Sequence, residues 1–296
     1  MTLGIKPIVD FAFKKIFGSP ENIAALIGLL NAVLNLSKPV VFVKILNPFN
    51  YQEFADSKQI VLDVRCRDSD GRYFNVEMQV AAFAGLVQRL VYYVCSMHCD
   101  QLNKGDSYAS LSPSISICLL SHVLFPGTSQ THHRFELLDR ESGRKLENAI
   151  EVHTVEMSKY NLSEETIAEA SNLEKWVFLL LRAQDYDAAT LKRLLPGIEF
   201  ETAIETIEVI SAKTEDKLMY DQREKAQRDF EWAIAGARDE GREEGREEGK
   251  LEGQIQLIQE LLGEPRTPDA ELRKLDTASL TGLLAGLQQQ LRNRQS

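Results

Sequence analysis

Two carboxylates and one amide, those of Asp63, Glu77 and Gln79, are the groups in this chain best suited to metal-dependent chemistry. Carboxylate oxygens are hard ligands, and Mg²⁺ prefers octahedral oxygen coordination in which several positions keep water. Asp63 and Glu77, with the backbone carbonyl of Met78, would hold such an ion and leave positions open for a phosphate oxygen and an attacking water. This arrangement favours hydrolysis of a phosphodiester. Strands often carry carboxylates on a solvent-exposed face, so the spacing alone leaves an ordinary polar surface as the alternative.

Two β-branched segments, residues 60–67 and 72–80, bring these side chains together. The sequence DSDG between them is a strong turn signal, which predicts a β-hairpin. In both segments the apolar side chains occupy even-numbered positions. Both apolar faces can pack on one core only if even-numbered residues pair with even-numbered residues, so that the numbers of paired residues have an even sum. A loop centred on Asp70 then sets Asp63 opposite Glu77. The two carboxylates and Gln79 are predicted to form an exposed cluster on the polar face of the hairpin.

The elements around the hairpin predict a mixed sheet flanked by helices, which is an α/β fold. Apolar spacing of 3.6 or 2 residues distinguishes the helices from the strands. The predicted helices cover residues 8–17, 20–34, 82–103 and, from Ser163, much of the chain to about residue 220, and the further predicted strands cover 40–46, 114–125, 133–138 and 149–156. The strand over 114–125 is nearly continuous in apolar residues, so we expect it at the centre of the sheet.

The predicted helix over 82–103 borders the hairpin, and we expect Gly105 to end it. Arg89 and Tyr93 lie one turn apart on this helix, and Arg suits phosphate through its bidentate fork. For Tyr93 the alternative is packing in the core, and for Arg89 it is a salt bridge to the neighbouring strand. The predicted apolar side of the helix consists of Phe83, Leu86, Val87, Leu90, Val91 and Val94.

Composition excludes several classes of protein. The 296 residues, 44% of them hydrophobic, suffice for one large or two small globular domains. No segment approaches the roughly 18 uninterrupted apolar residues of a membrane span, and the amino-terminal residues lack the pattern of a signal peptide, so we expect a cytoplasmic location. The four cysteines, Cys66, Cys95, Cys99 and Cys118, are predicted to be buried and reduced thiols. The segment CSMHC at 95–99 has no second ligand pair, which disfavours a zinc site.

The net charge of −10 argues against a nucleic-acid partner, but it is an average over two halves of the chain that differ in charge. Residues 1–150 hold 15 Lys and Arg against 14 Asp and Glu, whereas the remaining residues hold 19 against 30. The near-neutral first half can therefore carry a locally basic cleft, although ordinary solvated lysines are the alternative. The candidates for this cleft are Lys6, Lys14, Lys15, Lys58, Arg65 and Arg89.

The carboxyl-terminal part differs in amino-acid composition from the rest of the chain. Residues 236–253 repeat Gly-Arg-Glu-Glu every four residues, which provides no apolar seam and predicts either a marginal charged helix or a disordered linker. Short amphipathic helices follow, which suit a small helical hairpin or an association module. The sequence thus predicts a core domain over 1–220, a charged spacer over 221–253 and a helical module over 254–296.

The segment LDVRCRDSDGRYFNVEMQ, preceded by DFAFKKIFG and followed by RLVYYVCSMHCDQLNKGDSYASL, resembles the Rpn family of recombination-promoting nucleases, also called PD-(D/E)xK nuclease family transposases. The resemblance covers most of residues 5–185, including EMSKY at 156–160 and the following helix with Trp176. The segment GREEGREEGKLEG is also similar to tails carried by members of this family.

The resemblance implies a restriction-endonuclease-like core, with the element order αβββαβ, that cleaves DNA in a metal-dependent reaction. Asp63 would match the acidic residue of the motif, Glu77 the acidic residue two positions before its end, and Gln79 the terminal position. Lysine is usual at that position in the wider superfamily, and an amide supplies no positive charge to the transition state. Rpn-type sequences are similar in carrying Gln there, so the enzyme need not be inactive. Lys14 or Lys58 are candidates for the missing charge.

Asp10, in the DxxFK sequence of the first helix, has two interpretations. It would add a ligand through water, or it would complement the helix dipole as a carboxylate at the helix start. The resemblance also implies that Arg89 and Tyr93 act near the scissile phosphate.

These observations predict a DNA endonuclease of low sequence specificity that depends on Mg²⁺, with Mn²⁺ and Ca²⁺ as the other candidate ions. Asp63, Glu77 and Gln79 are its expected catalytic residues, and Asp63, Glu77 and Met78 its metal ligands. The alternative is a catalytically weak or inactive member that acts as a DNA-binding or protein-interaction module. A homodimer through the carboxyl-terminal helices is a further expectation, because cleavage of both strands needs two sites.

Overall fold

The computed structural model describes residues 1–51, 63–82, 84–147 and 149–294. Its internal contacts divide the chain into two compact units, residues 1–229 and residues 230–296. Within the described residues no single helix is long and apolar enough to cross a membrane. Among the same described residues, one pair of helices, Asp10–Gly18 with Pro20–Leu34, is long and apolar enough when taken together, and this pair is bent by 68°.

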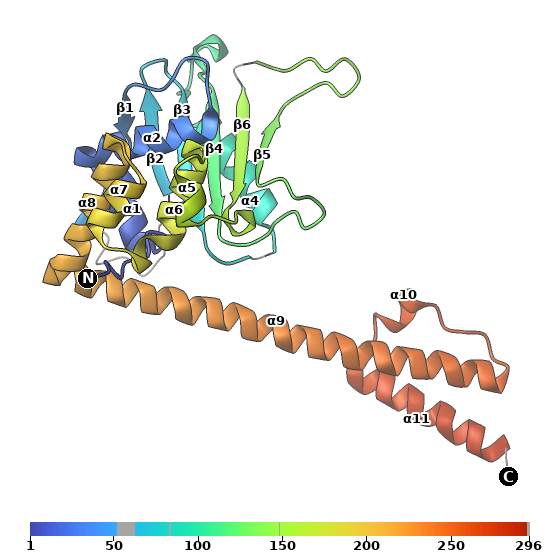
Figure 1. Cartoon of the computed structure of the whole chain (residues 1–296). Coiled ribbons are helices and arrows are strands. Elements are labelled where there is room, and N and C mark those ends of the chain that lie inside the picture. The colour runs from blue at the N-terminus through green and yellow to red at the C-terminus, as the bar shows by residue number, and fades with distance from the viewer. Residues whose placement is uncertain (52–62, 83, 148, 295–296) are drawn as a thin grey trace. The chain divides into compact units, whose positions relative to one another are not determined.

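A six-stranded mixed sheet forms the centre of the first unit (Figure 1). Its strands are β1 (Val43–Ile45), β2 (Asp63–Asp68), β3 (Tyr73–Gln79), β4 (Ser114–Leu120), β5 (His132–Glu136) and β6 (Ile150–Glu156), in the order β1-β2-β3-β4-β6-β5. The first three strands are antiparallel, β3, β4 and β6 are parallel, and β5 is antiparallel to β6. The predicted mixed sheet is confirmed, and β4 is buried along its whole length near the centre.

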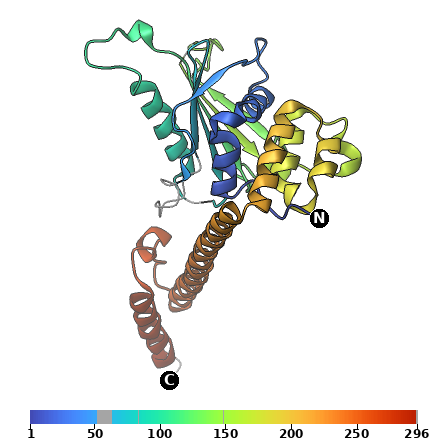
Figure 2. The same ribbon diagram turned by 90° about the vertical axis from the view of Figure 1, so that its left-hand side faces the viewer.

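Helices cover both faces of the sheet (Figure 2). The helices α1 (Asp10–Gly18), α2 (Ile23–Leu34), α6 (Asn172–Arg182) and α8 (Ile198–Ala212) contribute to the main core on one face, with the shorter α5 (Glu164–Ile167) and α7 (Ala188–Leu194) beside them. Helix α4 (Leu86–Cys99) lies on the other face. The order α1, α2, β1, β2, β3, α4, β4 contains the predicted αβββαβ core, which confirms the restriction-endonuclease-like fold class.

A chain of aromatic side chains links three helices of the main core. The ring centroids of Phe13 and Phe17 are 4.9 Å apart, those of Phe17 and Trp176 are 5.5 Å apart, and those of Trp176 and Phe200 are 4.7 Å apart. Each such pair adds about 0.5–1.5 kcal/mol beyond the apolar area that it buries. Helix α1, which carries Lys14, is therefore held firmly against α6 and α8.

Helix α4 corrects two predictions. It ends at Cys99, and Gly105 lies beyond it with φ +101°. Its buried side consists of Leu86, Leu90, Val94 and Met97. Val87 and Val91 are 48% and 49% exposed, because the side of α4 that faces the sheet is the stripe at i, i+4, i+8 and i+11.

Helix α9 (Thr214–Leu262) begins in the first unit, where ion pairs tie its first turns to the amino-terminal residues. Lys6 Nζ lies 2.9 Å from a carboxylate oxygen of Glu224, and Lys15 Nζ lies 2.5 Å from one of Asp216. These ion pairs disfavour Lys6 and Lys15 as the lining of a basic cleft, because α9 places a carboxylate beside each lysine.

The second unit contains the rest of α9, α10 (Asp269–Leu272) and α11 (Thr277–Arg294). Residues 236–253, which the sequence left open as helix or linker, are helical within α9. The apolar core of this unit consists of Ile255, Leu262, Leu272, Leu280, Leu284 and Leu287. The charged repeat thus precedes most of this core, and among its described residues only Leu251 packs, partly buried, against it.

Candidate active site

Asp63 and Glu77 face each other across the β2–β3 hairpin, in the register that the alternation predicted. Asp63 is the first residue of β2, and Glu77 lies near the carboxyl end of β3. Gly71 in the connecting turn has φ +89°, a conformation that favours glycine, and its N–H donates to the carbonyl of Asp68 at 3.3 Å. The turn and the two-residue alternation together position the two carboxylates.

Glu77 is buried, which corrects the prediction of an exposed carboxylate cluster. Glu77 is 4% exposed, because α4 packs over β3, β4 and β6 on the face of the sheet that carries its side chain. Burial raises the pKa of the Glu77 carboxyl, with Asp63 adding to the shift and Arg89 and a hydrogen bond from the Cys118 thiol opposing it. Glu77 Oε1 has no hydrogen-bond partner among the described residues. A buried carboxylate oxygen without a partner costs free energy, so this atom favours a cation beside it.

Asp63 is more accessible than Glu77, with a side chain that is 26% exposed. Its Oδ2 lies 3.2 Å from Arg65 Nε and 3.5 Å from Asn47 Nδ2. Asn47 Oδ1 accepts the backbone N–H of Arg65 at 2.7 Å, which fixes the amide against β2. Sequence reasoning missed Asn47, although a polar residue directly after the predicted strand 40–46 was an available signal.

Lys14 reaches the site from α1. Its Nζ donates to the backbone carbonyl of Asp63 at 2.5 Å, and the residue is 5% exposed. Burial lowers the pKa of the Lys14 ammonium, and the nearby Asp63 carboxylate opposes that shift. Of the two lysines considered from the sequence, Lys14 is beside the carboxylates, whereas Lys58 lies outside the described residues.

Gln79 and Met78 occupy opposite faces of β3. Gln79 is 7% exposed, and its Nε2 donates to the carbonyl of Ala81 at 2.9 Å. Met78 directs its side chain into the main core and is 1% exposed. The use of the Met78 carbonyl as a metal ligand stays a prediction.

Arg89 and Tyr93 lie on α4 beside this face of the sheet. The Arg89 guanidinium lies over the Tyr93 ring, 5.2 Å from its centroid, as their spacing of one turn allows. Arg89 is exposed and Tyr93 is half-buried, so the core-packing alternative for Tyr93 does not hold. The positive charge of Arg89 lowers the pKa of the Glu77 carboxyl, against the rise that burial causes.

Asp10 has a structural partner. Its Oδ1 accepts the backbone N–H of Phe11 at 2.8 Å, and its Oδ2 forms an ion pair with the guanidinium of Arg223 on α9. Asp10 is 1% exposed and lies in the first turn of α1. This arrangement favours the interpretation of Asp10 as a carboxylate at the helix start.

The chain matches the model of the PD-(D/E)XK nuclease family transposases over residues 7–237. It belongs to this family. No match to a curated protein or to a solved structure was found. Membership of the PD-(D/E)XK family supports a nuclease-like hydrolase that acts on DNA, in agreement with the fold.

PD-(D/E)XK nucleases typically use divalent metal ions, and the donor set at the hairpin fits such an ion in part. Within the described ranges, no group of three or more His, Cys, Asp and Glu side chains is placed to hold a metal. The hairpin instead offers two cross-strand carboxylates, and one of them has a buried oxygen without a partner. Asp63 and Glu77 would hold the ion, and the remaining positions would belong to water and substrate.

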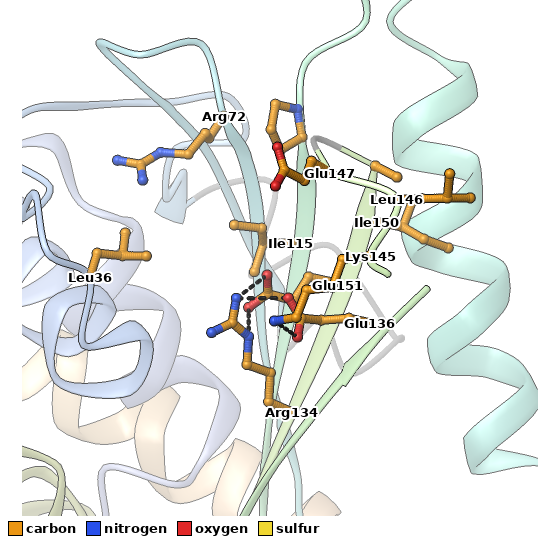
Figure 3. Close-up of a pocket in the computed structure, with 12 residues that line it drawn as sticks. Leu36, Arg72, Ile115, Arg134, Glu136, Lys145, Leu146, Glu147, Ile150 and Glu151 are labelled. Carbon is orange, nitrogen blue, oxygen red and sulfur yellow. Dashed lines mark hydrogen bonds and ion pairs between the residues drawn. The ribbon is translucent and has the colours of Figure 1, made fainter. Parts of the chain in front are cut away.

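A hollow of about 340 Å³ at the amino ends of β4 and β6 lies away from this PD-(D/E)XK site (Figure 3). Four of its charged side chains pair with one another. Arg134 lies 2.8 Å from Glu151 and 2.9 Å from Glu136, and Lys145 lies 2.5 Å from Glu136. Because these charges are mutually neutralised, the hollow is less suited to a phosphate than the hairpin site.

Proposed function

We propose that this PD-(D/E)XK protein is a metal-dependent DNA endonuclease of low sequence specificity, similar in activity to the recombination-promoting nucleases. The observation that carries the proposal is the pairing of Asp63 with Glu77, whose buried Oε1 has no partner among the described residues. Mg²⁺ is the ion that two carboxylates with retained waters suit best, and Mn²⁺ and Ca²⁺ are the other candidates.

The residues of the site divide several roles in the proposed hydrolysis among them. A bound divalent cation would supply Lewis acidity to the scissile phosphate. Asp63 and Glu77 hold the cation, and Gln79 orients the attacking water or a non-bridging phosphate oxygen. Lys14 supplies the positive charge that the amide of Gln79 lacks, from a position already against the main chain of Asp63. Arg89 binds a neighbouring phosphate, with its guanidinium oriented by Tyr93.

Cleavage of supercoiled plasmid tests the proposal. The purified protein is incubated with Mg²⁺, Mn²⁺, Ca²⁺ or EDTA, and an Asp63→Ala variant purified identically runs beside it. We expect metal-dependent nicking by the wild type that the variant loses. Equal nicking by both proteins would assign the activity to a contaminant.

A second candidate is a catalytically weak PD-(D/E)XK module that binds DNA or a protein. The amide at position 79 favours it, because Gln79 Nε2 is already engaged by the carbonyl of Ala81 and provides no cation. Absence of nicking by a folded wild type that still binds DNA would place this candidate first.

We also propose that the helices of residues 254–296 mediate a homodimer. Leu257 and Leu261 are 56% and 61% exposed, one turn apart on α9, and so form an apolar pair that a second copy would cover. Light scattering should give the mass of a dimer for the wild type and of a monomer for Leu257→Asp/Leu261→Asp. A dimeric variant would contradict this proposal.

A further inference from the structure

The face of the sheet that carries the two carboxylates continues over β2 and β1 beyond the edge of α4. Helix α4 packs on β3, β4 and β6. On β2 the same face presents Asp63, Arg65 and Arg67, since alternate residues of a strand share a face. Lys44 of β1 is paired with Arg67 and shares this face. Arg65, Arg67 and Lys44 are all exposed. We call Lys44, Arg65 and Arg67 the cationic row.

The outer part of the cationic row carries uncompensated charge. Within the described residues, no carboxylate lies within ion-pair distance of Lys44 or Arg67, whereas Arg65 contacts Asp63. The Arg67 guanidinium instead lies over the Tyr73 ring, 5.0 Å from its centroid, and its Nε donates to the carbonyl of Gly71 at 3.3 Å. These contacts orient the guanidinium without neutralising it, as a phosphate-binding arginine requires.

The acidic residues at the hairpin turn have partners of their own. Asp68 lies 2.6 Å from Arg72, and Asp70 lies 3.0 Å from Lys38. The positive potential of Arg67 is therefore not cancelled by its nearest acidic neighbours along the chain.

The geometry of the cationic row suits an extended polyanion. Alternate residues of a strand are about 6.6 Å apart, so Asp63 and Arg67 are separated by about 13 Å along a straight line. A sugar-phosphate strand held at Asp63 and Glu77 that followed β2 would pass Arg65 and then Arg67. On the other side of the carboxylates, Arg89 stacks on Tyr93 in the same way as Arg67 stacks on Tyr73.

We propose that one DNA strand of the substrate runs along β2, from the carboxylates toward the β2–β3 turn, with its phosphates bound by Arg67 and Lys44. This inference rests on the proposed function, because it takes the strand to be the one cleaved at Asp63 and Glu77. The contacts are with the backbone and are independent of base sequence, in keeping with low sequence specificity.

Fluorescence anisotropy with an end-labelled DNA duplex in Ca²⁺, over a series of salt concentrations, tests the binding without requiring cleavage. The proteins compared are the wild type, Arg67→Ala, Lys44→Ala and the double variant. The matched control is Arg193→Ala on α7, which also removes one exposed arginine but lies in the helical layer on the opposite face. Circular dichroism and thermal unfolding verify that every variant is folded.

We expect each single variant of the row to bind DNA about 3- to 10-fold more weakly than the wild type at physiological salt. The plot of log K against log salt has a negative slope. Each lost phosphate contact makes this slope shallower by about 0.9 for duplex DNA or about 0.7 for a single strand. The double variant should therefore lose about twice the slope lost by a single variant. Arg193→Ala should match the wild type.

An unchanged salt slope in Arg67→Ala and Lys44→Ala, or an equal loss in Arg193→Ala, would overturn the inference. Absence of DNA binding by the wild type would overturn it as well. Cleavage by the same proteins is measured in parallel. If the wild type cleaves DNA and the row variants bind it as tightly as the wild type does, the role of the cationic row is contradicted and the proposed nuclease is not. Binding that depends on Arg67, without any cleavage by the wild type, supports the row and contradicts the proposed nuclease.

Discussion

The Cys118 thiol lies beside the Glu77 carboxylate in the parallel ladder of β3 and β4 and donates a hydrogen bond to it. Both residues are buried on the face that α4 covers. Burial raises the pKa of the Cys118 thiol well above its usual range, and the Glu77 charge raises it further, so the thiol keeps its proton. Cys118 is therefore a positioning residue for one oxygen of Glu77, and Oε1 remains available for a cation.

Removing this hydrogen bond should move the pH dependence of cleavage. The bond stabilises the ionised form of Glu77, so Cys118→Ala should raise the pKa of that carboxyl and shift the rising limb of the pH profile of kcat/KM to higher pH. Cys118→Ser, which retains a donor, should restore the wild-type profile.

The matched control is Cys66→Ala, which removes a buried thiol from the opposite face of β2. Both alanine variants should lose about 1 kcal/mol of stability or somewhat more through lost packing. Only Cys118→Ala should shift the profile, and identical profiles for the two variants would contradict the positioning role.

The burial of Glu77 should also appear in the stability of the metal-free protein. Because its folded-state pKa is raised above the ordinary 4.5, the folded protein holds this proton more tightly than the unfolded chain. The free energy of unfolding therefore falls as pH rises from 4.5 through the folded-state pKa. The amide of Glu77→Gln does not titrate in this pH range. The wild type should therefore lose stability relative to the variant over that interval. Urea unfolding at a series of pH values measures the difference, and parallel curves would refute the expectation.

Divalent ions should stabilise the protein through the same carboxylate. An ion that binds only the folded state raises the free energy of unfolding by about 2.7 kcal/mol at 100 times its Kd. We expect Mg²⁺ or Ca²⁺ to raise the Tm of the wild type in calorimetry, and to leave the Tm of Asp63→Asn and Glu77→Gln nearly unchanged. An equal rise in all three proteins would indicate metal binding elsewhere.

Lys14 and Gln79 can be tested as alternative positions for one positive charge. Lys14→Met should reduce kcat by about 10- to 100-fold through loss of electrostatic stabilisation of the transition state. Gln79→Lys should retain or raise activity, and in the double variant it should recover part of the loss caused by Lys14→Met. Lys14→Met also removes the donor to the carbonyl of Asp63, so its folding is verified by thermal unfolding. A double variant as inactive as Lys14→Met would show that the two positions are not interchangeable.

Asp10 and Arg223 provide a purely structural counterpart to the active-site carboxylates. Arg223→Ala would leave the carboxylate of Asp10 buried without its ion-pair partner, a change that typically costs about 3–5 kcal/mol. We expect a lower urea midpoint but, below the unfolding transition, a metal dependence of cleavage like that of the wild type. A changed metal dependence in Arg223→Ala would instead support Asp10 as a ligand.

Local sequence patterns were sufficient for the hairpin and for much of the sheet. The alternation in 60–67 and 72–80, with the DSDG turn between them, predicted the pairing of Asp63 with Glu77, because side-chain direction in a strand depends only on position parity. The apolar run of β4 predicted its central place for a similar reason, since a strand covered on both faces must be apolar along most of its length.

Contacts between distant segments decided the rest. The burial of Glu77 depends on α4 lying across β3 and β4, and the hydrogen bond from Cys118 depends on a parallel pairing 41 positions away in the chain. Lys14 and Lys15 are adjacent in sequence, yet one reaches Asp63 and the other Asp216 of α9. Periodicity describes which side of an element is apolar, but the partner of each polar side chain follows from how the elements pack, and only the tertiary structure specifies that packing.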